Sequence, residues 1–241
     1  MKCRHCNAKI ENEFIDLGKA PPSNNYVSKD NYHSEEATFP LKVMVCNHCW
    51  LVQTEDFSEA DELFTDEYAY FSSTSKSFLE HAKNYVSKIT SFLELNQNSF
   101  VVELASNDGY LLKNFVKLGI PCLGIEPTKS TAKASREKGI ETVEEFFGKD
   151  VAAELSKTKK ADLIIGNNVY AHVPDINDFT DGIKELLSSK GTVTLEFPHL
   201  VELVKNNQFD TIYHEHYSYL SLFSVSKIFH KAGLKIYKVD K

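Results

Sequence analysis

Two cysteine pairs near the start of the chain have the spacing of a metal site. Cys3 and Cys6 form one C-x-x-C pair, Cys46 and Cys49 form the other, and 39 residues separate the two pairs. Two intervening residues let both thiolates of a pair face one ion, and two pairs complete the tetrahedral sulfur shell that zinc favours. Such a closed shell leaves no coordination position for water, so we predict a structural zinc ion.

A redox motif and a chance pattern are the alternatives to zinc for the cysteine pairs. A thioredoxin-like motif would need one pair at a turn from strand to helix, whereas this chain has two pairs without that context. His5 and His48 lie within the pairs and could compete as ligands, although four cysteines already saturate the site. Cys122, the fifth cysteine, lies in an apolar segment and is expected to pack inertly in the core.

A histidine-rich segment, TIYHEHY at 211–217, gathers groups that could move a proton. His214, Glu215 and His216 are consecutive, with Tyr213 before them. Histidine is the side chain best suited to take a proton near neutral pH, and an adjacent carboxylate can orient the ring and raise its basicity. From the residues alone three interpretations stay open: a catalytic cluster, a metal-binding H-x-H pair and a polar surface loop.

The segment 100–109, FVVELASNDG, predicts a buried strand that runs into a tight turn of small residues. A ligand can approach the backbone at such a turn, at the carboxyl end of the first strand of an α/β sheet. Glu126 ends the next apolar run, where a carboxylate can accept hydrogen bonds from both hydroxyls of a ribose. The glycine-rich dinucleotide fingerprint is absent, which argues against hydride transfer, and no lysine follows as in a P-loop. Ordinary polar residues at strand ends are the alternative interpretation.

Short apolar runs alternate with amphipathic segments after residue 96, which favours a parallel sheet with crossover helices. Asn167 and His172 follow one of these runs and should lie at the ligand-binding edge of the sheet. Residues 57–95 have helical spacing, and residues 17–34 have the composition of a loop. The expected strands are 100–105, 122–125, 161–166, 192–197 and 234–239, and the expected helices are 111–117, 130–138, 178–188 and 224–232.

The composition bounds the classes of partner. The chain has 241 residues, enough for one α/β domain and a smaller module, and a formal net charge of −7. An acidic chain lacks the electrostatic footprint of a nucleic-acid binder, so we expect no nucleic-acid partner. No apolar run approaches the ~20 residues that span a bilayer, and no secretory signal follows Met1. We therefore expect a cytoplasmic protein with reduced thiols and no membrane partner.

Together these motifs resemble a known family, the sugar-nucleotide C-methyltransferases with an N-terminal zinc-binding domain. Besides the cysteine pairs, the resemblance is carried by the segments 68–73 (YAYFSS), 103–112 (ELASNDGYLL), 124–128 (GIEPT), 167–175, 196–199 (EFPH) and 209–222 (FDTIYHEHYSYLSL). It implies an α/β fold, a Rossmann-like class I methyltransferase sheet with helices on both faces, preceded by a small zinc-binding module. The expected parts are a zinc module at 1–60, a helical connector at 61–95 that contributes to the active site, and an S-adenosylmethionine-binding domain at 96–241.

The resemblance implies methylation of a sugar carbon beside a keto group, on a nucleoside-diphosphate-linked deoxysugar. His216 would be the general base with Glu215 beside it. Three further side chains would surround the sugar and stabilise the enolate oxygen: Tyr213, Tyr70 and His172.

The resemblance also assigns the methyl donor, S-adenosylmethionine, to the turn after the first strand. Glu126 would hold the cofactor ribose, and Asn167 would lie near its methionine part. The rest of the pocket would come from Glu103, Ala105, Asn107 and Gly109.

Members of this family normally continue into a C-terminal domain that contributes to nucleotide-sugar binding, and their sheet normally ends with an antiparallel strand beside the sixth. We expect residues 234–239 to be that sixth strand, and a missing C-terminal domain or a partner chain to complete the fold. On this expectation the chain binds cofactor, methylates ketosugars weakly or not at all, and self-associates through an exposed sheet edge.

The same features are compatible with further hypotheses. A truncated fragment that binds zinc and cofactor without turnover is the main alternative. A zinc-ribbon nucleic-acid protein is disfavoured by the charge. A sugar O- or N-methyltransferase would not need a base that removes a proton from carbon.

Overall fold

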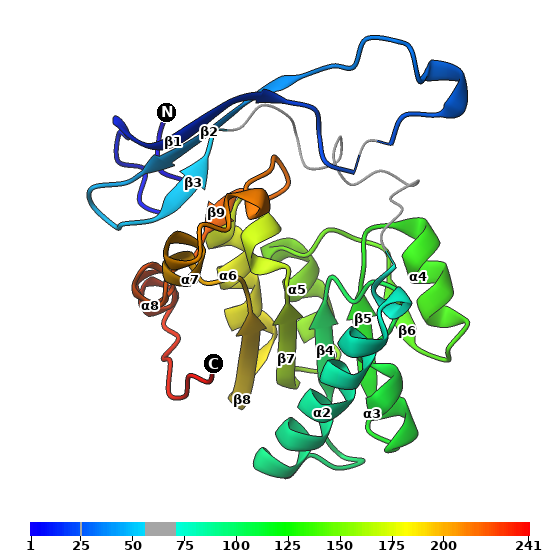
Figure 1. The fold of residues 1–241 in the computed structure, drawn as a ribbon. Coiled ribbons are helices and arrows are strands. Elements are labelled where there is room, and N and C mark those ends of the chain that lie inside the picture. The colour runs from blue at the N-terminus through cyan, green and yellow to red at the C-terminus, as the bar shows by residue number, and fades with distance from the viewer. Residues whose placement is uncertain (25, 56–70) are drawn as a thin grey trace. The chain divides into compact units, whose positions relative to one another are not determined.

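The computed structural model describes residues 1–24, 26–55 and 71–241, which divide into two compact units (Figure 1). Unit 1 draws on residues 1–63, 170–180 and 197–241, and unit 2 on residues 64–169 and 181–196. No helix in the described ranges is long and apolar enough to cross a membrane.

Unit 2 contains a five-stranded sheet in the order β6-β5-β4-β7-β8, and every pair in it is parallel. The chain fills the sheet outward from β4 in one direction and then resumes on the other side with β7. This reversal places the carboxyl end of β4 at the point where α/β sheets bind ligands. The strands are β4 (Val101–Leu104), β5 (Cys122–Ile125), β6 (Glu141–Val143), β7 (Ala161–Asn167) and β8 (Leu187–Glu196).

Helices flank this sheet, as the sequence predicts for the α/β class. In α2 the buried residues Ala82, Val86 and Ile89 recur at helical spacing, and Ser75 caps the helix by accepting a hydrogen bond from the backbone of Phe78. This face packs in one core cluster with Val101 and residues of β7 and α3. The helices are α2 (Lys76–Phe92), α3 (Lys113–Lys117), α4 (Lys129–Arg136), α5 (Lys149–Ser156) and α6 (Ile176–Leu186), with the 3-10 turn η2 (Ser72–Thr74).

Unit 1 is built on an antiparallel sheet in the order β1-β2-β3-β9. The strand β9, near the end of the chain, pairs with β3 through Val52 opposite Tyr219. Apolar residues of β2, β3, β9 and α7 share a single core cluster. The elements are β1 (Asn12–Ala20), η1 (Lys29–Asn31), β2 (Phe39–Val45), β3 (Val52–Thr54), η3 (Tyr170–His172), α7 (Leu200–Lys205), η4 (Phe209–Thr211), β9 (Ser218–Tyr219) and α8 (Leu222–Lys231).

Several predicted boundaries are wrong, each for a tertiary reason. Residues 234–239, expected as a sixth strand, form none, because their alternating pattern pairs with no described strand and Tyr237 and Val239 are exposed. Residues 17–20, expected in a loop, are the end of β1 because β2 supplies the hydrogen-bonding partner. The helix expected to reach residue 188 ends at Leu186, where β8 begins. The elements β6 and α5 were not predicted.

Gly182 in α6 provides a test of the packing. A Cβ at this position would lie 2.9 Å from the backbone carbonyl carbon and oxygen of Gly148, which cannot move aside as a flexible side chain could. Alanine normally stabilises a helix by about 1 kcal/mol relative to glycine. Overpacking costs about 1–3 kcal/mol, so we expect Gly182→Ala to lower the thermal midpoint.

The exposed neighbour Asp181 provides the control for this substitution, because Asp181→Ala changes helix propensity without adding a clash. Both variants would be compared by calorimetry. A Gly182→Ala midpoint equal to or above that of the original chain would contradict the close approach of α6 to Gly148.

Candidate functional site

The four predicted cysteine ligands come together in unit 1. Their sulfur atoms all lie within 4.8 Å of one another, with 3.4 Å between those of Cys3 and Cys49 and 3.5 Å between those of Cys6 and Cys46. Four sulfurs bound tetrahedrally at about 2.3 Å from a zinc ion would lie roughly 3.8 Å apart. These separations lie on both sides of that value, so the donor set fits zinc after shifts of about 1 Å or less.

The two cysteine pairs have the same local backbone geometry. The backbone N–H of Asn7 donates to the carbonyl of Cys3, and the N–H of Trp50 donates to the carbonyl of Cys46. Asn7 and Trp50 both have positive φ, which turns the chain sharply after each pair. The Cys49 thiol hydrogen-bonds to the Cys3 sulfur, and this lowers the pKa of Cys3. A thiolate, the form that binds metal, is thus already favoured at Cys3.

In unit 2 the turn after β4 has an alternating backbone conformation. Ala105, Asn107 and Gly109 have φ of 52°, 49° and 72°, so every second residue is left-handed. A Cβ at Gly109 would lie 2.4 Å from a methyl carbon of Ile140. Left-handed geometry costs alanine about 1–2 kcal/mol, and such strain persists only where the surroundings impose it. The backbone of this turn therefore has the left-handed positions of a glycine-rich loop, although only one of the three residues is glycine. The composition of the segment did not predict this conformation.

Glu126, the predicted ribose ligand, ties the end of β5 to this turn. Its Oε2 accepts a hydrogen bond from the backbone N–H of Asn107 at 2.9 Å, and its Oε1 accepts one from Thr128 at 3.0 Å. Burial raises the pKa of the carboxyl. The side chains of Thr128 and Thr131 also hydrogen-bond this carboxylate, which is therefore fixed at the end of β5.

The charged form of Glu103, at the end of β4, is unfavourable because the side chain is buried. It is 1% exposed, and its Oε2 has no hydrogen-bond partner among the described residues. Burial, then the negative charges of Glu126 and Asp108, raise its pKa well above the usual range. A cationic ligand would relieve this repulsion. S-adenosylmethionine, with its sulfonium and ammonium groups, fits these carboxyl groups.

Asn167 ends β7 at the same edge of the sheet. The following residue, Asn168, is left-handed, and its backbone N–H donates to the carbonyl of Glu196 at 2.7 Å. Asn107 contacts a further element, because its Oδ1 accepts a hydrogen bond from the backbone of Ser72 at 2.9 Å. Unit 2 therefore contains all six predicted cofactor residues at or next to the carboxyl ends of β4, β5 and β7.

In unit 1, His216 and Tyr213 form a hydrogen-bonded pair. The Nδ1 of His216 lies 2.7 Å from the carbonyl oxygen of Thr211, which can only accept, so Nδ1 carries the proton of the neutral ring. The remaining nitrogen, Nε2, lies 2.9 Å from the Tyr213 hydroxyl and accepts its proton in a hydrogen bond. Burial lowers the pKa of His216. The ring is therefore neutral at physiological pH, with its basic nitrogen directed at Tyr213.

His172 lies against this pair, with its ring centroid 4.5 Å from that of His216. Its Nδ1 donates to the backbone carbonyl of Glu215 at 2.9 Å. Burial, then the neighbouring His216, lower the pKa of His172 to about 3. Two neutral histidines and a tyrosine thus form one cluster, in which His216 is buried and the other two side chains are half-buried.

The carboxylate of Glu215 is bonded to residues near the start of the chain. It accepts hydrogen bonds from the Ser23 hydroxyl at 3.1 Å and from the Asn24 amide at 2.8 and 2.7 Å. The Thr211 carbonyl, which accepts from Nδ1, orients the His216 ring. The sequence analysis missed Ser23 and Asn24, and no motif could have linked them to a residue more than 190 positions away.

The metal-pair interpretation of the histidine segment receives no support. The Nε2 of His214 donates to the carbonyls of Phe39 and Pro40 at 3.3 and 3.2 Å, so this histidine is anchored to β2. Within residues 1–24, 26–55 and 71–241, only the four cysteines form a group that could hold a metal. Tyr70, the remaining predicted site residue, lies outside the described residues.

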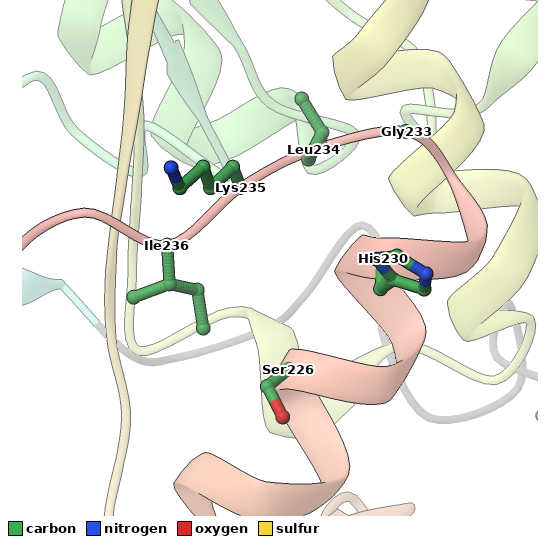
Figure 2. Close-up of a pocket in the computed structure, with 6 residues that line it drawn as sticks. All are labelled: Ser226, His230, Gly233, Leu234, Lys235 and Ile236. Carbon is green, nitrogen blue, oxygen red and sulfur yellow. The ribbon is translucent and has the colours of Figure 1, made fainter.

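An open hollow of about 520 Å³ lies beside α8 in unit 1 (Figure 2). Ser226 and His230 of the helix line it together with residues 233–236 of the following segment. None of the predicted site residues lines this hollow.

Comparison with known proteins identifies the class. A family model described as "Methyltransferase domain" matches residues 78–239, and one described as "Putative zinc binding domain" matches residues 3–64. A methyltransferase of this fold from Archaeoglobus fulgidus, titled as dependent on S-adenosylmethionine, has 16% identity and a TM-score of 0.53, over 64% of this chain and 68% of its own. A complex of the Haloferax volcanii Trm112 activator and a methyltransferase has 15% identity and a TM-score of 0.54, over 68% and 73%.

The chain therefore belongs to the S-adenosylmethionine-dependent methyltransferases, with a zinc-binding domain ahead of the methyltransferase domain. C-methyltransferase NovU of Streptomyces niveus is 35% identical over 239 residues, 99% of this chain. The matched region is 57% of the NovU sequence, so the chain spans little more than half the length of this relative. The resemblance to C-methyltransferases with a zinc-binding domain is confirmed, and the cofactors are S-adenosylmethionine and zinc.

The cysteine cluster predicts about one zinc ion per chain. Cys46→Ser should abolish zinc binding and unfold the surrounding module, because structural zinc contributes directly to folding. Metal analysis and thiol titration measure both effects. Protein without zinc whose four clustered thiols react freely would contradict the prediction.

Cys122 supplies the control for this experiment. Burial raises its pKa to about 11, so it should react slowly with thiol reagents near neutral pH. Cys122→Ser should leave the zinc content unchanged. Removal of zinc from this variant with a chelator should make the four clustered thiols react rapidly.

The contacts of Glu126 predict its effect on the cofactor. Glu126→Ala should weaken S-adenosylmethionine binding by about 1–3 kcal/mol, because ribose hydroxyls lose an acceptor and two backbone N–H groups lose theirs. Calorimetric titration would compare it with Glu145→Ala, which removes an exposed carboxylate of the same unit. Equal affinities for both variants would show that the ribose binds elsewhere.

Proposed function

We propose that this chain transfers the methyl group of S-adenosylmethionine to a carbon beside a keto group, on a nucleoside-diphosphate-linked deoxysugar. The observation that carries the proposal is the hydrogen bond of the half-buried Tyr213 to the buried His216, whose imidazole is neutral. A proton on carbon next to a ketone is acidic enough for a positioned histidine to remove. The 35% identity to a C-methyltransferase supports the same reaction type.

The hydrogen bonds of the pair suggest how the proton moves. The Nε2 lone pair of His216 accepts a hydrogen bond from the Tyr213 hydroxyl. When the keto oxygen accepts that hydroxyl instead, Nε2 becomes available to the adjacent C–H proton. The electron pair of the broken C–H bond then forms an enolate, whose oxygen Tyr213 stabilises as a donor does in an oxyanion hole.

S-adenosylmethionine, when bound, would supply the methyl group that the enolate carbon accepts, with the sulfonium sulfur released as a neutral thioether. The proton on His216 passes to solvent, which restores the neutral ring. His172, kept uncharged by burial, would contact the sugar without adding a competing positive charge.

The cofactor would bind at the alternating turn of unit 2. Glu103 and Glu126 would face its positive charge and its ribose, and the left-handed positions at Ala105, Asn107 and Gly109 let the ligand approach the backbone. Asn167 would face its methionine part. Methyl transfer to oxygen or nitrogen would leave the base without a role, because such acceptors already carry a lone pair and need no base that removes a proton from carbon.

His216→Ala tests the assignment of the base. In a protein that also carries the family's C-terminal domain, turnover of a nucleotide-linked ketosugar should fall by a factor of about 100 to 10,000, the usual effect of losing a general base. Cofactor affinity should stay unchanged. His33→Ala, at an exposed histidine of the same unit, serves as the control. Exchange of the sugar C–H proton with deuterated water, in the absence of cofactor, reports the base step separately.

The pH profile provides an independent readout in the same experiment. Because burial lowers the pKa of His216, the ring stays neutral until the pH is below the ordinary histidine value of about 6.5. The rate should remain level from neutral pH to that value and fall at lower pH as Nε2 becomes protonated. A rate that already falls at neutral pH, or His216→Ala protein with full exchange and turnover, would refute the assignment.

A further inference from the structure

Arg4 lies between the two cysteines of the first pair, yet its side chain binds the segment that carries His172. One guanidinium nitrogen donates to the carbonyl of Pro174 at 2.7 Å, and another donates to the carbonyl of Thr54 at 3.2 Å. The guanidinium also lies 5.2 Å from the centroid of the Tyr217 ring, within the range of a cation–π contact. The planar fork of arginine can reach two acceptors at once, which the single ammonium of lysine cannot do in the same geometry.

Thr54 extends this link to the segment that carries His216. Its hydroxyl donates to the backbone carbonyl of His216 at 3.2 Å, and its backbone N–H donates to the carbonyl of Tyr217 at 3.2 Å. Thr54 is buried at the end of β3, so these bonds are shielded from water. Arg4 and Thr54 together connect the two histidine-bearing segments.

The backbone of the first cysteine pair is fixed to the same region. The amide of Asn177 donates to the carbonyls of Arg4 and His5 at 3.0 and 2.9 Å. The Nδ1 of His5 lies 2.8 Å from Oδ1 of Asn177, which accepts its proton. Asn177 follows His172 by five residues. Its hydrogen bonds therefore attach the first cysteine pair to the segment that carries His172 a second time, in addition to the bond of Arg4 to Pro174.

Gln53 connects this arrangement to a metal ligand. Its amide donates to the Cys3 sulfur at 3.3 Å, and its Oε1 accepts the backbone N–H of Arg4 at 3.0 Å. Gln53 is fully buried and adjacent to Thr54 in β3. A change in the position of Cys3 would therefore be transmitted to both Arg4 and β3.

We propose that Arg4 is a positioning residue for the His172–His216 pair, and that it couples metal binding at the four cysteines to the geometry of the base. The inference deepens the proposed function and rests on it for its catalytic meaning. A base must be held within about 0.5 Å of its working position, and the Nδ1 of each histidine is bonded to a backbone carbonyl. Residues that fix the backbone of these segments therefore fix the rings.

The closing experiment uses the whole chain with ¹⁵N-labelled histidine. In the original protein the Nδ1–H groups of His172 and His216 should give protected signals of a single tautomer, because each donates to a carbonyl. Arg4→Gln should shift or broaden both signals while zinc content and S-adenosylmethionine affinity stay unchanged. Arg4→Lys should give an intermediate spectrum, and Lys9→Gln, an exposed cation of the same module, should leave it unchanged.

Kinetics provide the second readout. Arg4→Gln should lower kcat about 10- to 100-fold, the range for a misplaced reacting group, without changing KM for the cofactor. Removal of zinc with a chelator, which is expected to unfold the module around the cysteines, should change the two histidine signals at least as strongly. Unchanged histidine signals in Arg4→Gln protein that retains zinc would overturn the proposal.

Thr54→Val keeps the test decisive if Arg4→Gln loses zinc. This substitution removes the hydroxyl that donates to His216 and leaves the cysteine pairs untouched. Altered His216 signals in the zinc-loaded variant support the coupling, and unaltered signals overturn it. Failure of a protein that also carries the family's C-terminal domain to exchange or methylate any nucleotide-linked ketosugar would instead refute the proposed function, while the histidine spectra would still decide the coupling.

Discussion

The pairing of β3 with β9 is the constraint on which unit 1 depends. It places Val52 opposite Tyr219, so a strand that follows the second cysteine pair is bonded to residues immediately after the histidine segment. The pair is short, with two residues in β9, and receives support from the shared apolar cluster and from the bonds of Thr54. The cysteine cluster and the histidine cluster are therefore parts of one folded unit, although more than 160 residues separate β3 from β9.

Burial sets the chemistry of the histidine cluster. Desolvation disfavours the charged form of an imidazole, so His172 and His216 both stay neutral where an exposed histidine would be partly protonated. Backbone carbonyls select the tautomer in each ring by accepting from Nδ1. Carbonyl acceptors hold an imidazole in place without adding a negative charge. A carboxylate in that place would stabilise the protonated form and raise the pKa.

The proposed cofactor turn of unit 2 differs electrostatically from the histidine cluster, because it brings several acidic groups close together. Glu103, Asp108 and Glu126 bring negative charge into one buried region, and burial and mutual repulsion raise the pKa of Glu103. The strained left-handed conformation of Ala105 adds a second unfavourable feature. Both are typical of ligand sites, where the surrounding fold maintains an arrangement that the ligand then stabilises.

The sequence alone determined the class of fold, the four clustered cysteines and the strand ends at which the proposed cofactor residues lie, because these depend on local spacing and on short strand–turn patterns. The strands β4, β5 and β7 were predicted within a residue or two for the same reason. Only the tertiary structure decided that Thr211 orients His216, that Ser23 and Asn24 bind Glu215, and that residues 234–239 form no strand. Hydrogen bonds between distant segments leave no periodic trace in a sequence, and a strand forms only where a neighbouring strand offers its backbone.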